Sequence, residues 1–315
     1  MPPSSPLVVI VGPTAVGKTL KAIQLAELMD GEIVSADSRL FYRGMDIGTA
    51  KPSASEHAQV PHHLIDVAEP DQTWSIAVFQ QSAKKAIDEI HARGKLPFLV
   101  GGSGQYVHSV TKGWTPPSVK PNHELRAELE NLAKVNGPSW LHEKLSLLDP
   151  SAAERIDPRN VRRTIRALEV ILTSGHRFSE LKGKKPSPYF LVQIGLTLPR
   201  PELYKRIDAR IDEMFEHGLL NEVKTLLAKG YSPELPTLSA IGYRESVKIL
   251  RGQLTEEEAK IQMRKSTRIF VRRQANWFKE NDIEIKWFDT GTDADLIASY
   301  ISKCLTNKKA LPSPD

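Results

Sequence analysis

Cysteine is almost absent from this sequence, in which Cys304 is the only one among 315 residues. A single cysteine excludes an intramolecular disulfide and a cysteine-rich zinc site, so a reducing compartment does not weaken the fold. No apolar run approaches the roughly 20 residues that span a bilayer, and Met1 to Pro6 lack the basic and apolar regions of a secretion signal. We therefore expect a cytoplasmic protein without a membrane segment.

Neither sign of charge dominates, because 43 Lys and Arg against 38 Asp and Glu give a formal net charge of only +5. The average does not indicate a nucleic-acid partner, so any basic patch must be found locally. Apolar residues make up 40% of the chain, and its 315 residues exceed the size at which a single core usually stops growing. We predict two domains, one of them inserted in the other.

Short apolar runs and helical patterns alternate along much of the chain. The runs predict strands at 7–11, 32–36, 96–100, 191–198 and 283–288. Helical periodicity predicts helices at 18–29, 76–93 and 202–229. Such alternation is typical of an α/β protein, with a parallel sheet and helices on both faces. Ligands bind beyond the carboxyl ends of such strands, so Gly12, Asp37 and Gly101 should meet in one crevice.

Strand signals vanish between Pro116 and about Pro199, where the periodicity is helical and prolines mark the edges. We interpret residues 116–189 as an inserted helical domain that binds RNA. The catalytic core then consists of residues 1–115 and 190–305. The tail, 306–315, is polar and carries two prolines, which predicts disorder.

A glycine-rich loop follows the first predicted strand and precedes the first predicted helix. It fits the pattern of a glycine, four residues and Gly-Lys-Thr: Gly12, Pro13, Thr14, Ala15, Val16, Gly17, Lys18 and Thr19. Backbone N–H groups and a helix N-terminus cradle phosphate in such loops, while the lysine supplies a cation and the threonine can ligate Mg²⁺. The strand before and the helix after disfavour a chance match. We predict a P-loop-type sheet with flanking helices.

Asp37 stands where the second predicted strand ends. In nucleoside triphosphatases an acid at this place helps to hold Mg²⁺, whereas a helix cap is the plainer alternative. The residues from Ser38 to Pro52 are dense in hydrogen-bonding and aromatic groups. This density favours a loop that binds substrate.

The motifs of this chain resemble those of one known family, the tRNA dimethylallyltransferases, in order and over most of the length. They are GPTAVGKT at 12–19, DSRLFYR at 37–43, DIGTAKP at 46–52, PHHLID at 61–66, GGSG at 101–104, RALEV at 166–170 and IGYRE at 241–245. Two positions depart from the pattern of many members. Leu40 stands where they have Gln, and Ser103 stands where they have Thr.

The resemblance implies transfer of a dimethylallyl group from dimethylallyl diphosphate to N6 of the adenine 3′ to the anticodon in tRNA. It implies that the phosphate loop holds the diphosphate with Mg²⁺, that Asp37 is the general base, and that Lys18 and Thr19 face the leaving group. Contacts to tRNA carry over to Asp37, Ser38, Arg39, Leu40, Ser103, Arg126, Val161, Arg162, Arg163, Thr164 and Ile165. The expected partners are the anticodon stem-loop of tRNA and the diphosphate donor, bound by a monomer.

Two basic segments lie outside the phosphate loop. Residues 155–185 carry nine Lys and Arg against three acids, and residues 260–279 carry seven and none. One predicted helix, beginning near Pro158, shows a face made of Arg159, Arg162, Arg163 and Arg166, and an opposite, buried stripe made of Val161, Ile165, Leu168 and Leu172. We expect phosphate contacts at both segments, with a solvated helix face as the alternative.

Five further side chains are candidates for the site. Arg206 and Arg210 either add positive charge beside the diphosphate or lie on the surface of their helix. An aromatic partner for the target base could be Phe41, Tyr42 or Trp277, unless these rings belong to the core.

His62 and His63 lack a third ligand at a metal-binding spacing, so we predict structural roles for them.

Three rival functions remain: a small-molecule kinase or nucleoside triphosphatase, an RNA-binding module gated by a nucleotide, and a prenyltransferase acting on adenylate. The last has no need of a basic insert. ATP turnover without tRNA would favour the first, and RNA binding without product would favour the second.

Overall fold

The computed structural model describes residues 5–115, 117, 119–181, 183–184 and 187–309. Contacts divide the chain into two compact units, which we call the core unit (Met1–Thr111 with Ser187–Asp315) and the helical unit (Lys112–Pro186). The insert was expected at 116–189. The helical unit begins four residues earlier, at Lys112, and ends three residues earlier, at Pro186. Among the described residues, no helix is long and apolar enough to cross a membrane.

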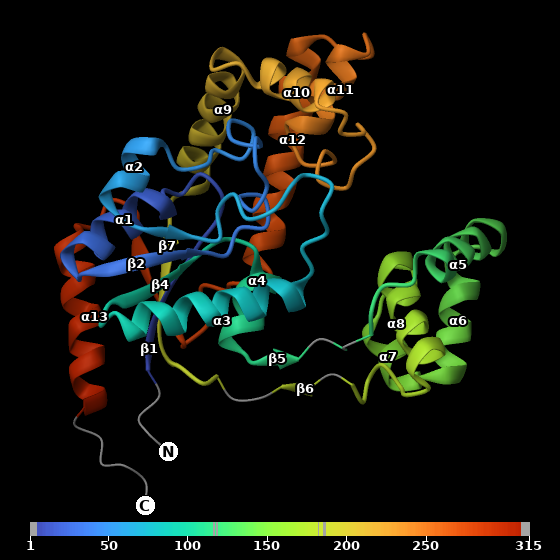
Figure 1. The fold of residues 1–315 in the computed structure, drawn as a ribbon, viewed down its shortest axis with the longest axis horizontal. Helices are drawn as coiled ribbons and strands as arrows, with labels where there is room; N and C mark the ends of the chain where they lie inside the picture. The colour runs from blue at the N-terminus through green and yellow to red at the C-terminus, as the bar shows by residue number, and fades with distance from the viewer. Residues whose placement is uncertain (1–4, 116, 118, 182, 185–186, 310–315) are drawn as a thin grey trace, which may run out of the picture. The chain divides into compact units, whose positions relative to one another are not determined.

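The core unit is built on a six-stranded sheet in the order β3-β2-β4-β1-β7-β8, in which every neighbouring pair is parallel (Figure 1). Its strands are β1 (Pro6–Val11), β2 (Gly31–Ser35), β3 (His62–His63), β4 (Leu96–Val100), β7 (Phe190–Thr197) and β8 (Ile285–Asp289). In the middle of the sheet, Val8 of β1 is in register with Phe98 of β4 and Val192 of β7. The apolar β1 side chains are fully buried, as expected for a strand covered on both faces.

Helices cover both faces of this sheet. Helices α1 (Lys18–Leu28) and α13 (Ala294–Lys309) pack against each other on one face, and α3 (Ile76–Ala92) packs with α4 (Gly104–Thr111) on the other. A short helix, α2 (Ala54–Gln59), precedes β3. The predicted fold class, an α/β protein with a parallel sheet of P-loop type, flanking helices and a helical insert, is confirmed.

Four more helices of the core unit gather beyond the carboxyl ends of the strands (Figure 1). They are α9 (Arg200–Glu216), α10 (Leu219–Ala228), α11 (Tyr243–Leu250) and α12 (Glu256–Ala275). The single helix predicted at 202–229 is wrong, because the chain turns at Gly218. This residue takes φ 94°, a conformation that favours glycine and ends α9.

Two other predicted boundaries in the core unit differ from the structure by more than one residue. The late strand begins at Ile285, since the Ile283 side chain is 99% exposed and pairs with no strand in the described chain. Helix α13 continues through 306–309, so the prediction of disorder is wrong for these four residues. The rest of that prediction, 310–315, lies outside the described residues.

The helical unit has a core of its own. Its helices are α5 (His123–Asn136), α6 (Pro138–Leu148), α7 (Pro150–Arg155) and α8 (Val161–Ser174), and its strands β5 (Trp114–Thr115) and β6 (Gly183–Lys184) form an antiparallel ribbon. Apolar side chains from all four helices and from the segment after α8 meet in the core, among them Leu129, Leu141, Ala152, Leu168 and Phe178.

Helix α8 begins at Val161, three residues later than predicted. The turn before it is held by two side chains: Asp157 accepts a hydrogen bond from Arg159 N–H, and the N-cap Asn160 accepts one from Arg163 N–H. The predicted buried stripe is wrong at Leu172, whose side chain is 57% exposed. The buried side of α8 consists of Thr164, Ile165, Ala167, Leu168, Glu169 and Val170.

Candidate active site

The phosphate loop connects β1 to α1, and helices from a distant part of the chain support it. Lys18, the first residue of α1, folds back so that Nζ donates to Pro13 O at 2.8 Å. The Val16 carbonyl accepts from Thr290 Oγ1 at 2.6 Å and from an Arg206 nitrogen at 3.4 Å. The loop is therefore braced by α9 and by the segment that follows β8.

Asp37 lies just beyond the carboxyl end of β2, and its carboxylate closes a local turn. Oδ1 accepts the Arg39 N–H at 3.0 Å, and Leu40 N–H donates to Asp37 O at 3.2 Å. Asp37 therefore caps a turn and not a helix. Within the described residues, Oδ2 has no hydrogen-bond partner, so one carboxylate oxygen remains available to a ligand.

These residues meet at one cavity of about 50 Å³ in the core unit. Lys18, Thr19 and Asp37 supply its polar wall. The remaining wall is largely apolar and comes from Ala22, Ile33, Ser35, Leu40, Pro52, His62, Ile65, Val100 and Gly101. The structure thus brings the ends of β2 and β4 and the start of α1 together, and it places Leu40 at the apolar side.

Positive charge and burial coincide beside this cavity. Burial lowers the pKa of Lys18 to about 8; the charge of Asp37 opposes this shift and that of Arg210 adds to it. Burial likewise lowers the pKa of Arg210, against the charge of Asp37. Arg210 donates to Thr49 O at 3.2 Å, but its buried Nε finds no partner in the described part of the chain. An anion would satisfy this donor. Arg206 reaches the loop at Val16 O, and Arg210 is buried close enough to Lys18 and Asp37 for their charges to interact, so neither merely covers the surface.

The residues around this cavity fit Mg²⁺. In phosphate sites Mg²⁺ takes one or two protein ligands and completes its shell with substrate oxygens and water. The Thr19 hydroxyl suits that pattern as the protein ligand. No group of three or more His, Cys, Asp or Glu within the described residues could hold a metal. His62 Nδ1 instead bonds Val60 O, and His63 Nε2 bonds Glu32, each at 2.7 Å.

The three candidate stacking residues have different surroundings. Phe41 is fully buried among Trp74, Phe79 and Tyr106, and Tyr42 is only 7% exposed. Both belong to the core, so the stacking hypothesis is wrong for them. Trp277 is 36% exposed and lies against the loop that carries Ser103. It remains a candidate.

The helical unit separates the residues expected to contact tRNA into two groups. Thr164 and Ile165 are buried, so their side chains are not available to RNA, and Val161 is partly buried. Arg162 and Arg163 are exposed, and neither forms an ion pair with any described residue. Only these two arginines of α8 offer uncompensated charge.

Two of the four arginines on the predicted basic face are paired with acids, so they do not offer free charge to RNA. Arg159 bonds Asp157 with nitrogen–oxygen distances of 3.0 and 2.7 Å, and Arg166 bonds the buried Glu169 at 2.5 Å. Arg126 of α5, another expected RNA contact, bonds the same Glu169 at 2.8 and 2.9 Å. The helical spacing did not reveal these pairs, because Asp157 lies before the helix and Glu169 lies on its buried side.

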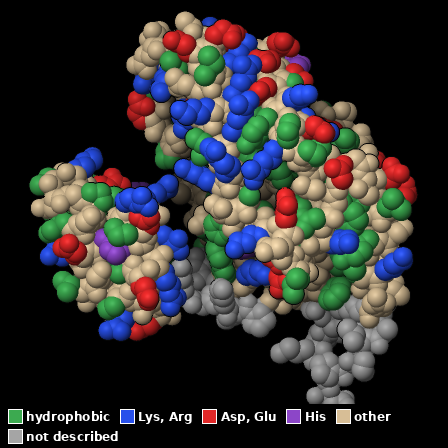
Figure 2. All heavy atoms as spheres, turned by 180° about the vertical axis from the view of Figure 1, so that it is seen from behind, with side chains coloured by type: hydrophobic (Ala, Val, Ile, Leu, Met, Phe, Trp, Pro, Cys, Tyr) green, Lys and Arg blue, Asp and Glu red, His purple; other side chains and the backbone are tan. Residues whose placement is uncertain are grey.

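A similar correction applies to the second basic segment. Acids on α9 pair with two of its arginines, since Arg264 bonds Asp212 at 2.8 Å and Arg268 bonds Asp208 at 2.7 Å. The cations of this segment that are exposed and form no ion pair with a described residue are Lys265, Arg272, Arg273 and Lys279. Figure 2 shows Lys and Arg side chains gathered over the region of α12. The basic surface is real but smaller than the sequence suggests.

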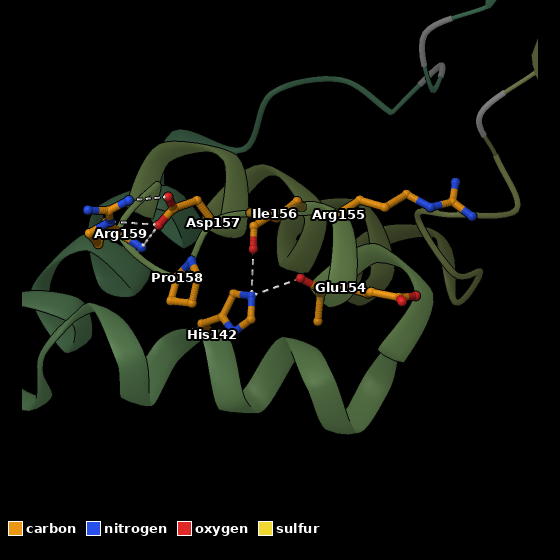
Figure 3. A pocket seen from close by; sticks show the side chains of 8 residues that line it. His142, Glu154, Arg155, Ile156, Asp157, Pro158 and Arg159 are labelled. Atoms are coloured by element: carbon orange, nitrogen blue, oxygen red, sulfur yellow. Dashed lines mark hydrogen bonds and ion pairs between the residues drawn. The ribbon is translucent and has the colours of Figure 1, made fainter.

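A larger hollow, of about 650 Å³, lies in the helical unit between α6, α7 and the turn before α8 (Figure 3). Its His142 Nε2 lies 3.1 Å from Ala153 O and 2.8 Å from Ile156 O, which ties α6 to α7. Arg155 points away from this histidine. The polar groups at the centre of the hollow thus bond one another and serve the fold.

One residue near the cavity was missed by sequence reasoning. Gln274 of α12 bonds both the phosphate loop, at Thr14, and the loop after β4, at Gly102. The role of Gln274 could not be predicted from the sequence, because both of its hydrogen-bond partners are far away along the chain.

Comparison with known proteins agrees with this geometry. A family model described as IPP transferase matches residues 40–281. A tRNA dimethylallyltransferase of Thermomicrobium roseum is 49% identical over 284 residues, which cover 90% of this chain and 86% of the relative. Another, from Roseiflexus sp. RS-1, is 52% identical over 274 residues, covering 87% and 90%.

Solved structures show the same relationship. The tRNA isopentenylpyrophosphate transferase of Bacillus halodurans superposes with a TM-score of 0.73 at 44% identity, over 97% of this chain and 98% of that one. A eukaryotic dimethylallyltransferase acting on tRNA gives a TM-score of 0.82 at 28% identity, over 96% and 80%. This chain therefore belongs to the IPP transferase family, the tRNA dimethylallyltransferases.

Proposed function

We propose that this prenyltransferase moves a dimethylallyl group from dimethylallyl diphosphate to N6 of the adenine 3′ to the anticodon, giving N6-(dimethylallyl)adenosine in tRNA. The names of the relatives, and the eukaryotic relative acting on tRNA, support the substrate class. The motif at 12–19 supports a diphosphate donor, and the motif at 37–43 supports Asp37 as the general base.

One observation carries the proposal: Lys18, Thr19 and Asp37 line a cavity whose opposite wall is apolar. A diphosphate needs cations and N–H groups, whereas a five-carbon chain needs a dry surface. Leu40, Ile33 and Ile65 provide such a surface within the same cavity. A carboxylate beside them can meet an amine that attacks the carbon next to the diphosphate.

In the proposed reaction the allylic C1–O bond breaks and the N6–C1 bond forms. The electron pair of the C–O bond leaves with the diphosphate, and the amine proton passes to Asp37. Because the adenine lone pair is delocalised, a base that accepts this proton as attack proceeds lowers the barrier. Lys18, the backbone N–H groups of the loop, and the nearby Arg206 and Arg210 stabilise the departing charge.

Thr19 would hold Mg²⁺ beside the diphosphate, where the ion would supply further charge neutralisation for the leaving group, and the free oxygen of Asp37 stays available for the amine proton. All other steps rest on the chain's own residues. The braces on Val16 O keep the loop in place, and the apolar wall excludes water that would otherwise hydrolyse an allylic cation-like species.

The basic surfaces provide a place for the nucleic acid. Arg162 and Arg163 on α8, with Lys265, Arg272 and Arg273 on α12, are free to neutralise phosphates. A base within a stacked loop cannot reach Asp37, so we propose that the target adenine leaves its stack, with Trp277 as a stacking partner.

Labelled dimethylallyl diphosphate, Mg²⁺ and total tRNA, incubated with the protein and then digested to nucleosides, test the proposal. We expect label in N6-(dimethylallyl)adenosine, at the position 3′ to the anticodon. Label in free adenylate, or ATP hydrolysis without tRNA modification, would contradict it. A tRNA whose target adenine is replaced by guanine is the matched control and should take up no label.

A further inference from the structure

The side-chain amide of Gln274 is buried between two loops of the candidate site. Its Oε1 accepts the Thr14 N–H at 2.9 Å, and its Nε2 donates to Gly102 O at 3.1 Å. The residue itself is only 5% exposed. One side chain on α12 thus joins the phosphate loop to the loop after β4, which are far apart in the sequence.

The chemistry of these two bonds calls for an amide. Thr14 offers a donor and Gly102 offers an acceptor, so the bridging group must accept at one end and donate at the other. A carboxylate only accepts, a lysine only donates, and an apolar side chain would leave both backbone groups buried and unpaired.

The backbone of Gly102 is shaped to receive this amide. A Cβ added at Gly102 would lie 2.2 Å from Gln274 Nε2 and 3.1 Å from Gly12 O, so a larger residue there would displace the Gln274 amide and crowd the phosphate loop. Two residues further on, a Cβ at Gly104 would lie 2.2 Å from the ring of Trp277. Gln274, near the end of α12, therefore packs against Gly102, and Trp277, just after the helix, packs against Gly104.

Helix α12 is also fixed to α9, the helix that carries the loop-facing arginines. The ion pairs of Arg264 with Asp212 and of Arg268 with Asp208 join the two helices. The phosphate loop thus has supports on two helices that are themselves joined. Of these supports, Gln274 alone takes a backbone N–H of the phosphate loop.

We infer that Gln274 is a positioning residue for the phosphate loop: it holds the loop, through Thr14, in the conformation that receives the diphosphate, and couples it to the loop at 101–104. This role rests on the proposed function, which identifies the ligand of the loop as a diphosphate. Gln274 does not touch the reacting atoms. Its loss should therefore weaken diphosphate binding through the shape of the loop.

Inorganic pyrophosphate with Mg²⁺ is a suitable probe, because its binding requires neither tRNA nor turnover. We expect Gln274→Met to raise the pyrophosphate Kd about 5- to 50-fold, in line with the loss of paired buried groups. The control is Gln262→Met, the same change about 18 Å away along the same helix, which should leave the Kd unchanged. An unchanged Kd in the Gln274 variant, with only the Tm lowered, would overturn the inference.

Gln274→Glu provides a second readout that a merely structural role would not produce. A protonated carboxylic acid can accept from Thr14 and donate to Gly102 as the amide does, whereas the ionised form loses the donor and repels the diphosphate. The Kd of this variant, divided by that of the wild type, should therefore be at least about ten at pH 8 and fall toward one as the pH is lowered through the pKa of the introduced carboxyl.

A ratio near one at pH 8 would contradict the inference, even if Gln274→Met failed to fold. The proposed function fails in a different way: pyrophosphate binding and its dependence on residue 274 would persist, but no prenyl group would appear in tRNA. The two hypotheses are thus tested separately.

Discussion

Arg126 of α5 and Glu169 of α8 form a two-point ion pair in the helical unit, with nitrogen–oxygen distances of 2.8 and 2.9 Å. Glu169 is fully buried, and it also accepts from Arg166 and from the Asn122 N–H. Burial opposes ionisation, but the hydrogen bonds from Arg126, Asn122 and Arg166 prevail and hold the pKa of Glu169 below its ordinary value.

Glu169→Gln should destabilise the helical unit by roughly 2–4 kcal/mol, near the lower part of the range for breaking a buried pair, since both guanidinium groups remain partly exposed. A carboxyl with a lowered pKa stabilises the fold above its unfolded pKa, and this contribution is lost as the pH falls through the folded pKa. Thermal unfolding of both proteins should therefore differ most at neutral pH and converge in acid. A difference that does not depend on pH would contradict this.

Asp37→Asn separates the role of the base from that of the turn. The amide oxygen can still accept the Arg39 N–H, so we expect both substrates to bind, but it cannot take the proton. The single-turnover rate at saturating substrates should fall by about two to four orders of magnitude. Asp37→Ala, which also loses the turn, should be no faster. A near-normal rate in the Asn variant would remove Asp37 from the mechanism.

Replacing Arg162 and Arg163 together by Gln should weaken tRNA binding and reduce its dependence on salt, because these arginines form no ion pair in the described chain. The log–log slope should fall by about 0.7–0.9 per lost phosphate contact. The matched control replaces Arg159 and Arg166, whose charges acids already compensate, and should change the slope less. Equal effects, or an unaltered slope, would favour a solvated face.

The low pKa of Lys18, about 8, should make diphosphate binding depend on pH. The charge of the ligand favours the ammonium form, so binding above pH 8 should take up a proton, and affinity should fall as the pH rises through this value. Calorimetry of pyrophosphate binding in buffers of different ionisation enthalpy measures this uptake. Lys18→Met serves as the control, and if the variant takes up protons equally, another group is responsible.

The parts of the fold that depend on local pattern were predictable. The apolar run before Gly12 and the glycine motif predict β1, the loop and α1 almost to the residue, because strand, loop and helix follow one another along the chain. Asp37 and Gly101 were placed beside the loop by a rule for parallel sheets, and both line the cavity.

Features that depend on pairing between distant segments were not predictable. The cations of α12 look unpaired in sequence, yet Asp208 and Asp212 lie opposite Arg268 and Arg264 on another helix. For the same reason Gln274 was missed. Leu172 was expected in the core from its spacing alone, but the helical unit has no partner for that side of α8 among its described elements, and the side chain stays in solvent.

The position of β1 in the sheet has a consequence for synthesis on the ribosome. This strand is made first, but one of its two edges must wait for β7, which begins at Phe190. At 5–20 residues per second, that edge stays without its partner for roughly 10 to 40 seconds. During this interval an apolar strand with an open edge is exposed to pairing with other nascent chains. The helical unit is translated in the same interval, so a slow codon within it would lengthen the exposure of β1 without altering a single residue of the protein.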